Sequence, residues 1–171
     1  HMKFSNILIL AVILGGGYTY LFPKDKTPTI NEKLISQFDK HDVINSSEWG
    51  KGNVIDGVQI YSVRKNYSVF QSIWSLGSGE AGVMVLTEGK DPKIEAAFAL
   101  SQCNQLASAV IDAKTAATSD AVFSVFQKAL SAEKDDKGVL RATGEVGGKS
   151  YDVSARVIDA VLTFSCGIKT T

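Results

Sequence analysis

Three glycines in the stretch WSLGSGEAGVMVL, residues 74 to 86, have the G-x-G-x-x-G spacing of a dinucleotide-binding loop. In such a loop the glycines let the backbone approach a pyrophosphate, which lies on the N-terminus of the following helix. Here Gly77, Gly79 and Gly82 are followed by the run VMVLTE, which is typical of a strand. Because a strand offers no helix N-terminus to a phosphate, the sequence predicts a turn between two strands.

His41 is the second residue whose chemistry could be catalytic. An imidazole titrates near neutral pH, and the neighbouring Asp39 or Asp42 could orient it as a general base. No nucleophile motif accompanies it, and a solvated histidine is also favoured at a helix C-terminus. We therefore expect no catalytic, cofactor-binding or metal-binding residue, and we expect a binding protein and not an enzyme.

The two cysteines, Cys103 and Cys166, are predicted to face inward from a helix and from the last strand. A pair of cysteines in an exported domain indicates a disulfide, which here would close a loop of roughly 60 residues. Two buried free thiols are the alternative. A zinc site is not expected, because two cysteines without a nearby histidine cannot complete the ligand shell.

Residues 4 to 22 carry no charge and are long enough to cross a bilayer as a helix. They form either an uncleaved membrane anchor or a signal peptide that is cut before Tyr18. We favour the anchor, because the apolar character resumes after the three glycines. A buried helix of a soluble protein is the third interpretation, but consecutive glycines would weaken it.

This segment defines the expected domain organisation. Residues 1–23 are a tag remnant, His1, followed by the anchor or signal segment, and residues 24–29 are a polar linker. Residues 30–171 are long enough to form a single exported domain with its own core. The 18 basic and 18 acidic residues balance, and no basic block is present, so nucleic-acid binding is not expected.

The residue pattern predicts an α+β fold. A helix capped by Thr29 is expected over 30 to 42, followed by a loop in NSSEWGKGN. Three strands are expected between 53 and 87, where Asp56-Gly57 offers a turn or a bulge. One helix is capped by Asp91, and another begins near Ser119 and ends in the charged stretch EKDDKG. Three further strands follow, with Gly147-Gly148 as a hairpin turn. This order indicates an antiparallel sheet packed by two or three helices, preceded by the N-terminal hydrophobic helix.

The aromatic residues of the first strand region suggest how the domain acts. Most of them are expected in the core, but Trp49 and Tyr67 lie near polar loops and are the candidates for exposed contacts with a partner protein. Alanine-rich helices over a curved sheet could alternatively leave a cavity for a small ligand.

The leading hypothesis is therefore a membrane-anchored protein-interaction module, such as an envelope assembly component, an inhibitor or an immunity-type protein. We expect another protein as its partner and place it at a bacterial inner membrane, attached through residues 4–22, with its domain in the periplasm. The alternative is a periplasmic or secreted small-ligand carrier, released after signal cleavage. A hydrolase with an unrecognised site is the third hypothesis. The oligomeric state is not indicated.

Overall fold

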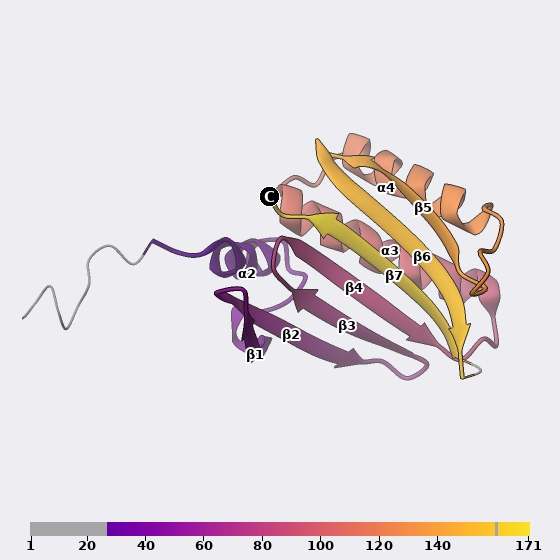
Figure 1. Cartoon of the computed structure of the whole chain (residues 1–171), viewed down its shortest axis with the longest axis horizontal. Coiled ribbons are helices and arrows are strands. Elements are labelled where there is room, and N and C mark those ends of the chain that lie inside the picture. The colour runs from indigo at the N-terminus through magenta and orange to yellow at the C-terminus, as the bar shows by residue number, and fades with distance from the viewer. Residues whose placement is uncertain (1–26, 160) are drawn as a thin grey trace, which may run out of the picture.

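Seven strands form one antiparallel sheet in the computed structural model, which describes residues 27–159 and 161–171 (Figure 1). The elements in chain order are α2 (Ile30–Lys40), the short 3-10 helix η1 (Ser46–Glu48), β1 (Gly50–Ile55), β2 (Val58–Asn66), β3 (Phe70–Leu76), β4 (Glu80–Thr87), α3 (Pro92–Ile111), α4 (Ala116–Leu130), β5 (Leu140–Val146), β6 (Lys149–Ile158) and β7 (Val161–Lys169). This confirms the predicted α+β class with helices packed on an antiparallel sheet.

The strand order is β1-β2-β3-β4-β7-β6-β5, so the chain forms two meanders that meet where β4 pairs with β7. The two long helices form the connection between the meanders and lie together behind one face of the sheet (Figure 1). The opposite face, which we call the open face, carries the outward-pointing residues of each strand. Its central rows are rich in glycine and serine, for example Gly82, Gly167 and Ser165.

The helix starts follow the predicted capping chemistry. Thr29 caps α2 by accepting a hydrogen bond from the Glu32 amide, and Asp91 caps α3, whose first residue is Pro92. The second long helix was expected near Ser119 but begins at Ala116, because Thr115 provides its cap. The first helix ends at Lys40, two residues before the predicted end.

The first meander contains four strands and not the predicted three. Asp56 and Gly57 have φ angles of 51° and 76°, the left-handed conformation of a two-residue hairpin turn. They divide the predicted first strand into β1 and β2, and β1 begins at Gly50 in a segment that was expected to be loop. The Asp56-Gly57 pair therefore reverses the chain direction completely, whereas the sequence pattern also allowed a β-bulge.

The glycine-rich stretch is a strand-to-strand turn, as predicted. β3 ends at Leu76 and β4 begins at Glu80, and the Gly77 amide donates to the Glu80 carbonyl at 2.8 Å. Gly82 lies inside β4, so no helix follows the loop. The predicted Gly147-Gly148 turn joins β5 to β6.

The sulfur atoms of Cys103 and Cys166 lie at disulfide-bonding distance, with their Cα atoms 5.6 Å apart. The bond ties α3 to β7 in the middle of the core, where both residues are buried. The buried Tyr151 hydroxyl donates to the Cys103 carbonyl at 2.9 Å, and burial raises the pKa of this tyrosine far above its usual value. The phenol is therefore a neutral donor that holds β6 against α3.

The predicted hydrophobic helix over residues 4 to 22 lies outside the described residues. Among the helices that the structure does describe, none combines the length and the apolar character needed to cross a membrane.

The two ends of the sheet differ in what they carry. At one end Thr29, before α2, lines the same hollow as Gly79 and Thr171, so the described chain begins and ends there. At the other end, which we call the distal end, β4 ends at Thr87 and β7 begins (Figure 1). The two features described next both lie at the distal end.

Candidate functional site

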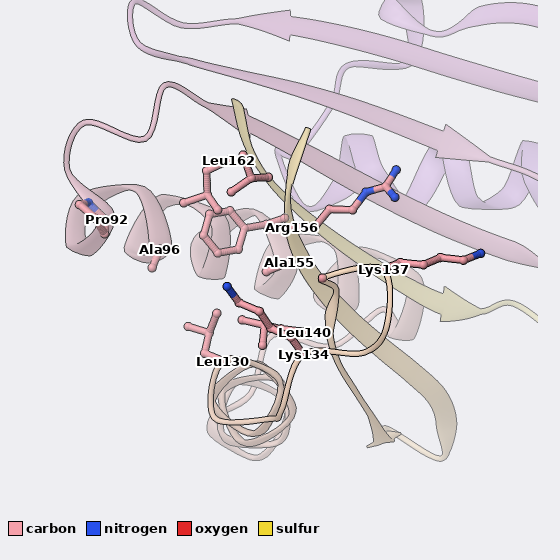
Figure 2. Close-up of a pocket in the computed structure, with 12 residues that line it drawn as sticks. Pro92, Ala96, Leu130, Lys134, Lys137, Leu140, Ala155, Arg156 and Leu162 are labelled. Atoms are coloured by element: carbon pink, nitrogen blue, oxygen red, sulfur yellow. The ribbon is translucent and has the colours of Figure 1, made fainter. Parts of the chain in front are cut away.

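An apolar pocket of about 490 Å³ lies at the distal end between the two long helices and the β6–β7 hairpin (Figure 2). Twelve residues from both helices, the α4–β5 connection and three strands line it. They are Pro92, Ala96, Leu130, Lys134, Lys137, Gly138, Leu140, Ala155, Arg156, Val157, Leu162 and Phe164.

The pocket exists because β6 extends at the distal end beyond β5 and beyond the end of α4. β5 begins at Leu140, which pairs with Ala155, so the last residues of β6 have no partner from β5. α4 ends at Leu130, and the chain then turns through a polar loop before it reaches β5. The small side chains of Ala96 and Ala155 leave the space between these elements unfilled.

A buried carboxylate positions the first turn of α3 at the pocket. Glu95 accepts hydrogen bonds from the amides of Gly89 and Asp91, at 2.7 and 3.0 Å. Burial by itself raises the pKa of Glu95, but these bonds, together with one from Thr87, outweigh it and hold the pKa below the usual value. The charged carboxylate thus fixes the loop that leads into Pro92.

The charge of the pocket has one sign. Eight of its lining residues are apolar and three are cationic, and among the described lining residues none carries a carboxylate. Figure 2 shows the Lys134 side chain extending toward the pocket, whereas Lys137 and Arg156 extend away from it. The pocket therefore combines apolar contact surface with one ammonium group, a combination that suits a ligand with an apolar body and an acidic end.

A second surface feature at the distal end contains Tyr67. Its ring meets Phe98 edge-to-face at 5.1 Å, and Phe98 stacks on Phe70 at 4.2 Å. Tyr67 is 43% exposed and Val69 is also exposed. We call the group Tyr67, Val69, Phe70 and Phe98 the aromatic patch. It joins the β2–β3 turn to α3.

Trp49, the other predicted contact residue, has a different environment. It lies half-buried against Phe38, with 5.3 Å between the ring centroids, and it packs on the core. Its indole Nε1 is buried without a hydrogen-bond partner among the described residues. Only Tyr67 of the two predicted residues is therefore largely exposed, and the two belong to different clusters.

His41 is paired with the carboxylate of Asp112, whereas a solvated histidine was expected. Its Nε2 lies 2.8 Å from Asp112 Oδ1, and the Lys40 ammonium contacts the same carboxylate at 2.9 Å. Hydrogen bonds from His41 and Lys40 lower the pKa of Asp112. The carboxylate partner of His41 is therefore neither Asp39 nor Asp42, the two residues that the sequence suggested. Asp39 instead accepts a hydrogen bond from the Ser46 amide. The contact joins the C-terminal ends of α2 and α3.

The sequence indicated that a cavity between the sheet and the helices was possible. It did not indicate that Lys134, Lys137 or Arg156 would line that cavity. Lys134 lies in the charged stretch EKDDKG, which was interpreted only as a helix end. Comparisons of the chain with protein families, curated proteins and solved structures found no match.

Proposed function

We propose that this domain binds an amphipathic organic anion, an acyl chain with a carboxylate end, in the apolar pocket of the distal end. The observation that carries the proposal is the Lys134 side chain extending toward a pocket that is otherwise mainly apolar (Figure 2). The pocket volume of about 490 Å³ falls within the common range of small-molecule sites, roughly 300–1,000 Å³. Transfer of the ligand's methylene groups from water into the pocket supplies the affinity.

The lysine supplies the preference for an acid. A carboxylate that leaves water needs a charged hydrogen-bond partner to offset its lost hydration. The Lys134 ammonium is such a partner, and no carboxylate among the described lining residues competes for it. The domain is then a carrier that holds its ligand without transforming it.

The position of the pocket bears on the proposed location of the protein. We infer an inner-membrane protein with a periplasmic domain, attached through residues 4–22, and the alternative is a periplasmic or secreted carrier. The described chain begins at the end of the domain opposite the pocket (Figure 1). A domain anchored through its N-terminus would therefore present the pocket away from its own membrane. Ligand would then enter from the periplasmic solution.

Replacing Lys134 by glutamine is expected to weaken decanoate binding by about tenfold or more, since a hydrogen bond to a charged group contributes roughly 1.5–3 kcal/mol. Lys137→Gln is the matched control, because it removes the same charge from a side chain that extends away from the pocket. Isothermal titration calorimetry of the whole chain measures both. Equal weakening in the two variants would mean that the pocket does not use Lys134 specifically.

The aromatic patch supports a second function, a protein-interaction module. Tyr67 and Val69 expose apolar surface at the distal end, supported from below by the Phe70–Phe98 stack. Aromatic side chains on a rigid base are typical of interface hot spots. The partner in this proposal is another envelope protein.

The double variant Tyr67→Ala/Val69→Ala is expected to lose a discrete cross-linked species that the whole chain forms in intact cells, with its stability changed by about 0.5 kcal/mol or less per site. Phe123→Ala, which removes an exposed aromatic ring from α4, should keep that species. Cross-linking followed by mass spectrometry makes the comparison. Persistence of the species in the double variant would exclude the aromatic patch as the interface.

A further inference from the structure

The open face of the sheet has a hollow of its own, of about 270 Å³, over β5, β6 and β7. Arg141 pairs with Ser154, Ser154 with Ser165, and Arg156 with Thr163, so two guanidinium groups and three hydroxyls come together across three neighbouring strands. The other lining residues are Met84, Val139 and Ile158. We call this site the open-face hollow.

The two arginines of the hollow have no ion-pair partner within the described part of the chain. Asp135 and Asp152 lie near Arg141 but make no ion pair with it. Burial raises the pKa of Asp152, and a hydrogen bond from the Val139 amide is the main cause that lowers the pKa of Asp135, so the charge of Arg141 determines neither. Elsewhere on the same face, Lys169 pairs directly with Glu80 at 2.9 Å. The hollow is therefore a local concentration of positive charge that a bound anion would neutralise.

Thr163 provides an independent indication of a ligand. It lines the hollow, it is only 3% exposed, and its Oγ1 has no hydrogen-bond partner among the described residues. A buried hydroxyl without a partner costs free energy. An acceptor oxygen bound in the hollow would satisfy this donor.

We propose that the open-face hollow binds a phosphate group. A guanidinium presents two parallel N–H donors that match two oxygens of a phosphate, and two arginines can hold different edges of the tetrahedron. The hydroxyl of Thr163 donates to a further oxygen, and Ser154 and Ser165 lie on the same surface. The group is either inorganic phosphate or the phosphate of a phosphoester.

This site is separate from the apolar pocket. The pocket lies on the side of the helices, whereas the hollow lies on the open face. Arg156 contributes to the lining of both, but its side chain extends away from the pocket (Figure 2). Lys134 lines only the pocket and Arg141 only the hollow, so variants of these two residues test the two sites independently.

The test is a titration of the whole chain with inorganic phosphate at constant ionic strength, followed by calorimetry. Arg141→Gln and Arg156→Gln are each expected to weaken binding by about tenfold or more, as loss of a charged hydrogen bond predicts. Arg64→Gln is the matched control, because Arg64 is exposed on the same face but is bonded to Gln71 at 3.0 Å. It should bind phosphate as the native chain does.

Thr163→Val separates a loss of phosphate binding from a loss of folding. Valine has nearly the shape of threonine, and it removes a hydroxyl that is unsatisfied in the described structure. Its stability should therefore be unchanged or higher while its phosphate affinity falls several-fold. Circular dichroism during thermal unfolding checks the first part of this expectation.

Two results would overturn the proposal: the absence of saturable phosphate binding to the native chain, or equal weakening in Arg64→Gln and the hollow variants. A parallel titration with glycerol 3-phosphate distinguishes the two sources of the group. Similar affinities support recognition of the phosphate alone, whereas tighter binding of the ester supports a phosphoester ligand.

Discussion

Reduction of the Cys103–Cys166 disulfide lowers the free energy of unfolding by about 4 kcal/mol, as expected for a cross-link that closes a loop of this size. The two residues are 63 positions apart, and the loop between them contains the C-terminal part of α3, all of α4, β5 and β6, and the start of β7. The oxidised chain therefore has far fewer unfolded conformations than the reduced one. Urea unfolding with and without reductant measures the difference.

The double variant Cys103→Ala/Cys166→Ala controls this experiment. It should unfold at nearly the same urea concentration as the reduced native chain, and reductant should not change its transition. If the native chain has the same unfolding free energy with and without reductant, the disulfide contributes nothing to stability, contrary to our expectation.

Phe38→Ala lowers the free energy of unfolding by about 3–5 kcal/mol, the usual cost of removing a fully buried aromatic side chain. Phe38 is the anchor of α2 in the core. Its ring packs edge-to-face on Trp49 and on Trp74, at 5.3 and 5.8 Å. The alanine would leave a cavity between α2 and the sheet, which both tryptophans border.

Tryptophan fluorescence during urea unfolding measures this effect directly. Ile30→Ala is the control on the same helix, because Ile30 is largely exposed. It should change stability by about 0.5 kcal/mol or less. A loss of only that size for Phe38→Ala would mean that α2 is not an integral part of the domain.

Local chemistry made much of this fold predictable. The caps at Thr29 and Asp91 fixed two helix starts, and Gly147-Gly148 marked its hairpin. The inward direction of Cys103 and Cys166 followed from helical and strand periodicity. These features depend on neighbours in the sequence, which a residue pattern can reveal.

The pocket depends on contacts between distant segments. Ala96, Leu140 and Leu162 come together only because β7 pairs with β4 and places β6 and β5 beyond it. Hydrophobic periodicity identifies strands but does not set their order. Trp49 illustrates the same limit, since its polar neighbours in the sequence suggested exposure while Phe38 half-buries it.

The open-face hollow has the same origin. Arg141 and Arg156 lie 15 positions apart, on strands joined by a hairpin, so the register of β5 against β6 sets their proximity. The buried Thr163 hydroxyl belongs to a third strand. No spacing in the sequence marks this group, because its members are ordinary outward-facing strand residues.

The central claim is that the apolar pocket holds an acyl chain. It is tested most directly by the affinity of the whole chain for saturated fatty acids of increasing length, measured by calorimetry. Burial of each added methylene is expected to tighten binding by about fourfold until the pocket is full. Ala96→Leu, which narrows the pocket, should end this dependence at a shorter chain length, and Ala117→Leu on the exposed side of α4 should leave it as in the native chain. Absence of binding at every length, or an unchanged length dependence in Ala96→Leu, would contradict the claim.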